Sequence, residues 1–210
     1  MGSLVLFALL LLSIPIDRAR RRSVLFYELE PNVAEAVDAL YQALDELGRN
    51  ERLWHIPRAE SAAGGRYTRT AIRLRYGTPR FLKTNLEVPF LPAGRQTLYF
   101  MPEQLLVVDP KGVGAVSYRE LGVEERLVRE LEEEHLPADA RVIEWRWKHE
   151  TKSGRADRRY KNNYKIPSVE YRRVRFTSAT GVNELFQSSR AASERSVRSC
   201  VERIVAATAS

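Results

Sequence analysis

Gln96-Thr-Leu-Tyr-Phe-Met-Pro-Glu-Gln-Leu-Leu-Val-Val-Asp-Pro-Lys-Gly112 is the stretch that best defines the fold class. Two short apolar runs, 96–100 and 104–109, flank Met101-Pro-Glu103, whose composition suits a tight turn. Asp109-Pro-Lys-Gly112 is a second turn signal, and the run Val113–Tyr118 follows it. Three successive runs joined by short turns predict an antiparallel arrangement of strands.

Downstream of these runs the sequence predicts further strands and a closing helix. Apolar and charged residues alternate over Ile143–Trp147, as in a half-buried strand. The runs 172–177 and 182–187 flank the turn residues 178–181 and predict a hairpin. Near the end of the chain, an apolar stripe at helical spacing, with Cys200 beside it, predicts a C-terminal helix. The stripe consists of Val197, Val201, Ile204 and Val205.

The segment between these two regions, residues 121–134, is open to two interpretations. Its Glu, Leu and Arg content favours a helix by propensity. The buried face of that helix would be Val123, Leu127, Val128 and Leu131. Most of the same apolar positions also fit a period of two, and strands are expected on both sides. Helix and strand therefore both remain open here.

Upstream, an amphipathic helix is predicted between Pro31, which suits a first helical turn, and Gly48, where a helix should stop. Glu30 precedes it and can cap it. One face of this helix is apolar, and we expect it to pack against a sheet. That face consists of Val33, Val37, Leu40, Tyr41, Leu44 and Leu47. Strands or extended segments are predicted at 24–29, 52–56 and 70–76.

Composition restricts the class of protein. The chain has 210 residues, 44% of them hydrophobic, which suffices for one sizeable core. Its 34 Lys and Arg residues outnumber 27 Asp and Glu residues, giving a net charge of +7. This charge permits an anionic partner, either phospholipid or nucleic acid. The single cysteine, Cys200, excludes an internal disulfide and favours a reducing compartment.

The chain begins with an uncharged, largely apolar run, residues 1–16, which is followed by Arg18, Arg20, Arg21 and Arg22. The run is slightly shorter than the ~20 residues that cross a bilayer as a helix, and this leaves open that the chain continues upstream of Met1. Positive charge after the run favours a single-pass anchor in a bacterial inner membrane, because Lys/Arg-rich flanks stay in the cytoplasm. The following domain would then face the cytoplasm. A cleaved secretory signal and an apolar helix packed on the domain are the alternatives.

Several segments carry a resemblance to a family of bacterial membrane-anchored proteins. They are Lys83-Thr-Asn85, Gly94–Phe100, Val113–Tyr118, Asp157–Asn163 and Gly181–Leu185. In that family a hydrophobic segment precedes a domain of this kind, and no activity is implied. From about Leu86 onward, the succession of antiparallel strands and one final helix resembles a pleckstrin-homology-like split barrel.

Together, pattern and resemblance imply an α+β fold. We expect an N-terminal hydrophobic helix, an amphipathic helix, and an antiparallel β-barrel or sheet closed by a C-terminal helix. The expected parts are a membrane segment with a basic flank (1–22), a helix with short strands (23–80), and the pleckstrin-homology-like barrel (81–210). Lipid-binding domains of that class hold a phosphoinositide with Lys and Arg around the first hairpin loop. Met101-Pro-Glu103 contains neither, which argues against a specific lipid.

Motifs for catalysis are sparse. The three histidines are His55, His135 and His149, and none is spaced from cysteine or from another histidine as metal ligands are. We interpret His55 as a structural residue of a strand. Glu132-x-x-His135 matches half of a di-iron motif, but its charged surroundings indicate a solvated face. Asp109 and Lys111, with an acid such as Glu87, resemble part of a metal-dependent nuclease site; a structural turn at Asp109 is the plainer reading. We therefore predict no catalytic residues, no resident metal and no cofactor, and leave enzymatic activity open.

The candidate contact surface is the basic stretch 148–165, in which tyrosines and asparagines lie between cations. Cationic groups beside aromatic rings can hold phosphate oxygens and stack on bases, and near a membrane they can also lie against anionic lipid. The residues proposed for binding are Lys152, Arg155, Arg158, Arg159, Tyr160, Lys161, Tyr164 and Lys165. We expect a membrane-anchored, non-catalytic interaction or scaffolding protein that contacts anionic lipid or a protein. A nucleic-acid-binding or nuclease-type protein is the alternative, and a plain solvated loop is the simplest reading.

Overall fold

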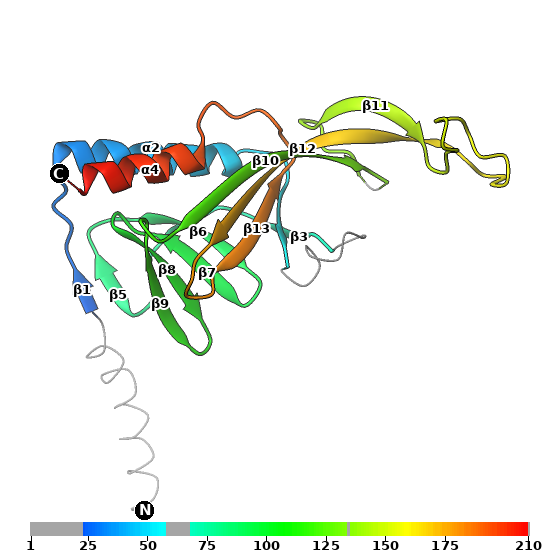
Figure 1. The fold of residues 1–210 in the computed structure, drawn as a ribbon. Coiled ribbons are helices and arrows are strands. Elements are labelled where there is room, and N and C mark those ends of the chain that lie inside the picture. Colours follow the sequence, from blue (N-terminus) through cyan, green and yellow to red (C-terminus); the bar gives the residue numbers. More distant parts are fainter. Residues whose placement is uncertain (1–22, 58–67, 134, 210) are drawn as a thin grey trace, which may run out of the picture.

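The computed structural model of the protein describes residues 23–57, 68–133 and 135–209. These residues form a mixed α+β fold with two helices and three β-sheets (Figure 1). All strand pairs in the two larger sheets are antiparallel. The predicted membrane segment, with Arg18, Arg20, Arg21 and Arg22, lies outside the described residues. Within them, neither helix is long and apolar enough to cross a bilayer.

The six-stranded sheet has the order β10-β12-β13-β2-β3, and β11 also pairs with β12. Its strands are β2 (Leu53–Ile56), β3 (Thr70–Ile72), β10 (Gly122–Leu131), β11 (Arg141–Trp147), β12 (Lys165–Thr177) and β13 (Asn183–Ser188). The five-stranded sheet has the order β4-β6-β7-β8-β9. Its strands are β4 (Arg75–Gly77), β6 (Val88–Ala93), β7 (Gln96–Phe100), β8 (Gln104–Asp109) and β9 (Gly112–Ser117). A small parallel pair consists of β1 (Ser23–Leu25) and β5 (Leu82–Thr84).

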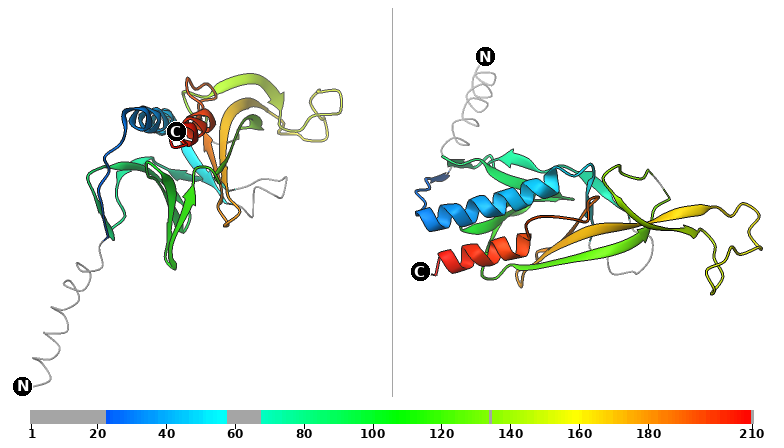
Figure 2. Two further views of the ribbon diagram at one scale, coloured as in Figure 1. Left: turned by 60° about the vertical axis from the view of Figure 1, so that its left-hand side comes forward. Right: turned by 90° about the horizontal axis from the view of Figure 1, so that it is seen from above.

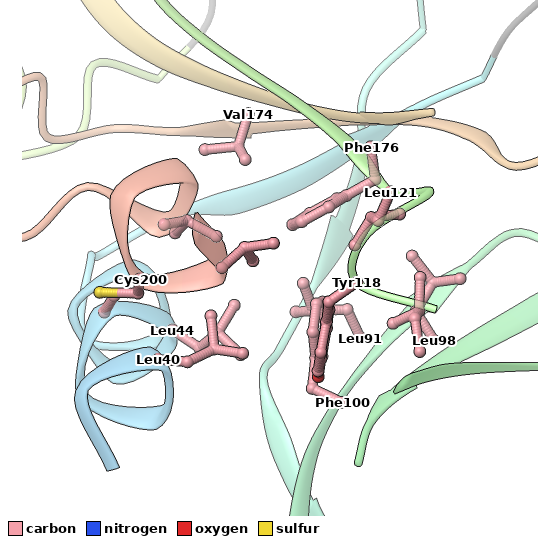
Figure 3. Packing of buried hydrophobic residues seen from close by; sticks show 14 of the residues in the cluster. Leu40, Leu44, Leu91, Leu98, Phe100, Tyr118, Leu121, Val174, Phe176 and Cys200 are labelled. Atoms are coloured by element: carbon pink, nitrogen blue, oxygen red, sulfur yellow. The ribbon is translucent and has the colours of Figure 1, made fainter. Parts of the chain in front are cut away.

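The two helices, α2 (Pro31–Gly48) and α4 (Val197–Ala207), lie side by side on one face of the molecule (Figures 1 and 2). Their apolar faces meet residues of both larger sheets in the main core. In Figure 3, Leu40 and Leu44 of α2 and Cys200 of α4 lie opposite Phe100 of β7 and Phe176 of β12. The rings of the two phenylalanines meet edge to face at 5.4 Å, so the two sheets are joined through this core.

Helix α2 confirms the predicted helix, and its buried residues include most of the predicted stripe. Gly48 is its last residue. A Cβ atom at this position would lie 2.9 Å from Cβ of Leu74, so a side chain here would force the passing chain away. Glu30 occupies the N-cap position, but its side chain makes no capping hydrogen bond. In α4, Cys200 lies within the buried stripe rather than beside it.

The strands predicted around Gln96–Gly112 are confirmed as β7, β8 and β9 with the expected turns. The hairpin across residues 178–181 is confirmed as well, although β12 is much longer than predicted. Strand β11 also forms where predicted, but its alternation does not match a half-buried strand, because Trp145 is 57% exposed.

Within the segment 121–134 the chain forms a strand, β10, over Gly122–Leu131, and the helical interpretation is wrong. Strand β10 pairs with β12 along ten residues, from Gly122↔Thr177 to Leu131↔Ser168. Side chains across this ladder form ion pairs, including Arg172 with Glu125 and Arg173 with Glu130. Pairing and cross-strand charge attraction together outweigh helix propensity. Leu127 and Leu131, expected in a buried helical face, are instead 55% and 45% exposed.

The described strands do not close into a barrel. The run 70–76, predicted as one strand, divides between β3 and β4, which belong to different sheets. The chain then changes sheet again at a turn after β9, where the backbone N–H of Glu120 donates to the carbonyl of Ser117 at 2.9 Å. Strands β9 and β10 are each at the edge of a different sheet. The sheets therefore pack through side chains and do not join edge to edge.

Candidate functional site

The basic stretch lies at the free end of the β11–β12 hairpin, and residues 148–165 are called the basic tip below. The C-terminal half of β12 belongs to the six-stranded sheet, where Val174 and Phe176 are in the main core. Its N-terminal half pairs with β11 and extends beyond the rest of the fold (Figures 1 and 2). At ~3.3 Å per residue, a strand of this length spans roughly 40 Å. One continuous strand thus holds the basic tip away from the core.

Hydrogen bonds within the basic tip fix its backbone. The backbone N–H of Lys148 donates to the carbonyl of Tyr164 at 2.9 Å. The side-chain amide of Asn163 accepts from the N–H of His149 at 3.0 Å and donates to its carbonyl at 2.6 Å. Farther out, Glu150 and Ala156 form an isolated antiparallel bridge. The backbone of the tip is therefore held in a defined conformation by hydrogen bonds within the tip.

The seven cations of the basic tip fall into three groups: two are paired with acidic residues, Lys165 lies over the ring of Trp147, and four have neither kind of contact with a described residue. Arg159 is paired with Asp157 at 2.5 Å, and Lys148 with Glu133 at 2.7 Å. Four further cations are exposed, and no described acidic group lies within 4.0 Å of them: Lys152, Arg155, Arg158 and Lys161. The tip has seven basic and two acidic residues, a net charge of +5 out of the chain's +7. Most of the uncompensated charge of the sequence is thus gathered on this one projection.

The aromatic rings of the basic tip are partly engaged within it. Tyr160 stacks on His149 with ring centroids 3.7 Å apart. The ammonium of Lys148 lies 5.3 Å from the ring of Tyr164 and donates to its hydroxyl at 3.3 Å. Lys165 lies over the ring of Trp147 at 5.5 Å. All eight residues predicted for binding are exposed, and the fold brings them together at one end of the molecule.

Asp157 should titrate well below an ordinary aspartate. Hydrogen bonds from the side chain and then the backbone of Arg159 lower its pKa from 3.8 to about 2. Because the folded-state pKa is depressed, the stabilisation is complete above about pH 4 and is lost as the pH falls towards 2. An NMR titration of the Asp157 carboxyl carbon is expected to show this low midpoint.

The variant Arg159→Ala should return the midpoint to near 3.8, whereas Arg158→Ala should leave it low because Arg158 makes no hydrogen bond to Asp157. A normal midpoint in the unaltered chain would contradict the pairing.

A buried polar cluster, which the sequence did not reveal, holds the base of the hairpin. Glu132 is 4% exposed and accepts two hydrogen bonds from the guanidinium of Arg69, at 3.0 and 2.8 Å. The hydroxyl of Tyr171 on β12 donates to the same carboxylate at 2.7 Å. Arg69 also lies over the ring of Trp54 at 4.7 Å. Burial, and then the hydrogen bond to Glu132, raise the pKa of Tyr171 above its usual range.

This cluster corrects the interpretation of Glu132 as part of a solvated face. Its neighbour in the half di-iron motif, His135, points elsewhere and lies 3.8 Å from Glu51. His55 is a buried strand residue, as predicted, with Nε2 2.6 Å from the carboxylate of Glu184. Among the described residues, no group of three or more His, Cys, Asp or Glu side chains could hold a metal ion.

Asp109 has a structural role in the turn between β8 and β9. Its Oδ1 accepts from the backbone N–H groups of Lys111 at 2.7 Å and of Gly112 at 2.8 Å. We expect Asp109→Ala to lower the free energy of unfolding by about 1 kcal/mol, because both donors lose their acceptor. Urea unfolding of the full chain, with and without Mg²⁺, measures this loss.

Asp109→Asn is the matched control, since its amide oxygen can still accept these hydrogen bonds. A Mg²⁺-dependent gain in stability that Asp109→Asn removes would favour the nuclease-type alternative.

Comparison of the chain with protein-family models, with curated proteins and with solved structures finds no match. The geometry and charge of the chain itself are therefore the basis for its function.

Proposed function

We propose that the protein is a membrane-anchored, non-catalytic interaction protein whose basic tip binds an acidic segment of a protein partner. The observation that carries this proposal is the group of four exposed, unpaired cations at the end of a projecting two-stranded hairpin. Exposed charges of one sign attract a complementary partner and accelerate its encounter. No chemistry on a substrate is required for such a role.

Membrane anchoring is supported by the sequence of residues 1–22, an apolar run followed by arginines. We propose a single pass through a bacterial inner membrane with the domain in the cytoplasm. A pleckstrin-homology-like relationship of residues 81–210 is likewise a proposal, supported by the order of antiparallel strands followed by α4.

The position of the basic tip favours a protein partner over the bilayer that holds the anchor. Residue 22 connects to β1, and in all three views the tip extends from the other side of the molecule (Figures 1 and 2). A nucleic acid is the less favoured partner because stacking on bases needs free ring faces. One face of Tyr160 is already covered by His149.

A photo-crosslinking amino acid at position 153, in the full chain expressed in bacterial cells, tests the partner class. We expect a protein adduct that survives nuclease treatment and lipid extraction. The same adduct should disappear when the four unpaired cations are changed to glutamate. An adduct that nuclease removes, one formed with lipid alone, or a protein adduct insensitive to the four changes would each overturn the proposal.

A further inference from the structure

The first described strand is held firmly against the fold. Ser23, Val24 and Leu25 of β1 pair in parallel with Leu82, Lys83 and Thr84 of β5. The backbone N–H of Ser23 donates to the carbonyl of Phe81 at 2.9 Å. Beyond the strand, the side chain of Asn85 holds both backbone groups of Tyr27, at 2.9 and 2.8 Å. Residues 23–27 are therefore a fixed part of the domain.

Although the backbone of residues 23–27 is fixed, this segment presents apolar side chains to solvent. Val24 is 66% exposed and Phe26 79%, whereas Leu82 on the neighbouring strand is buried. Single exposed apolar residues are common on protein surfaces, but adjacent ones on a fixed strand form a patch that favours contact with an apolar phase. We call these side chains, with Arg80 and Lys83, the β1–β5 surface.

Basic residues border the apolar side chains of the β1–β5 surface. Arg80 and Lys83 are exposed and, with Val24 and Phe26, line an open hollow of about 700 Å³. None of the described residues lining this hollow is acidic. Apolar groups beside cations suit the interface of an anionic bilayer. The apolar groups enter the boundary of the acyl chains, and the cations contact the lipid phosphates.

We propose that the β1–β5 surface lies on the anionic membrane that holds the anchor, with Val24 and Phe26 in the interface and Arg80 and Lys83 at the lipid phosphates. This inference rests on the membrane anchoring proposed above. It commits to the bilayer as occupant because Val24 follows within two residues the arginine-rich end of the apolar run, and because the charges are complementary. The contact fixes how the domain is oriented, which an anchor alone does not.

The test uses the full chain in vesicles of phosphatidylcholine and phosphatidylglycerol. A polarity-sensitive dye is attached at Thr78→Cys, which lines the hollow, or at Ser153→Cys in the basic tip. Cys200 is buried, so labelling under native conditions is directed to the introduced cysteine. Position 78 is far from the anchor in sequence, so only the fold can bring it to the bilayer. Quenching by lipids that carry a nitroxide reports contact.

We expect quenching at position 78 and none at position 153. Quenching at 78 should be lost when Val24→Ser, Phe26→Ser, Arg80→Glu and Lys83→Glu are combined, although the chain still sediments with the vesicles. Changing the four unpaired tip cations to glutamate is the control and should leave quenching at 78 intact.

Each other outcome identifies what has failed. A chain that sediments with vesicles but shows no quenching at 78 overturns this inference and leaves the anchor in place. A blue-shifted dye at 78 without quenching means that another part of the chain covers the surface, which also overturns it. Failure to sediment overturns the anchor itself. Quenching at 153 would overturn the proposed direction of the basic tip.

Discussion

Changing Lys152, Arg155, Arg158 and Lys161 together to glutamate is expected to weaken binding of an acidic polypeptide by at least about 30-fold. Each exposed ion pair contributes about 0.2–1 kcal/mol, and reversal replaces this attraction with a repulsion of similar size, so four changes amount to about 2–8 kcal/mol. At 1.4 kcal/mol for each factor of ten, the lower figure alone corresponds to a loss of affinity of roughly 30-fold. Fluorescence anisotropy with labelled poly-L-glutamate and the full chain in vesicles of phosphatidylcholine alone measures the change.

The control separates local geometry from total charge. Four other exposed cations have no described acidic partner and lie outside the basic tip: Arg73, Arg75, Arg95 and Lys111. Changing these to glutamate alters the net charge by the same amount. Both variants should weaken the long-range electrostatic attraction, which salt screens. Only the tip variant should lose most of the affinity. Equal losses in the two variants would mean that net charge, and not the basic tip, determines binding.

The parts of the fold that sequence predicted well are those decided by local signals. The turn at Asp109 and the helix between Pro31 and Gly48 depend on residue types within a few positions of one another. Strand β10 is different, because its state depends on pairing with β12, about fifty residues away. The change of sheet after Ile72 is also decided by distant strands.

The same distinction holds for the candidate site. The density of cations between residues 148 and 165 is visible in the sequence, so all eight predicted residues lie in one surface element. Which cations are neutralised is not visible: Lys148 pairs with Glu133 from the preceding connection. The cluster around Glu132 brings together four distant segments and has no local pattern that would reveal it.

The basic tip and the β1–β5 surface lie on different sides of the domain, and this separation makes the two proposals compatible. One surface is apolar and basic beside the anchor, whereas the other is polar, strongly basic and held out on a hairpin. A domain oriented by the first would direct the second away from the bilayer. The orientation of the tip then depends on a rigid junction between the β11–β12 hairpin and the rest of the domain.

Glu132→Ala tests this junction and is expected to cause a large loss of stability. The substitution leaves the Arg69 guanidinium, whose side chain is 17% exposed, without its main partner, and it removes the acceptor of the Tyr171 hydroxyl. Breaking a buried ion pair on one side costs about 3–5 kcal/mol, a large part of the roughly 5–15 kcal/mol that stabilises an ordinary domain. Urea unfolding of the full chain, followed by tryptophan fluorescence, measures the loss.

The cause is tested by replacing both members of the ion pair. Arg69→Met combined with Glu132→Met should be less destabilising than Glu132→Ala alone, because no charge is then left buried and unpaired. Tyr171→Phe removes one hydrogen bond and should cost only about 1 kcal/mol. If Glu132→Ala cost no more than Tyr171→Phe, the carboxylate would not be the centre of the cluster, and the hairpin would have to be held by the pairing of β12 with β10 and β11.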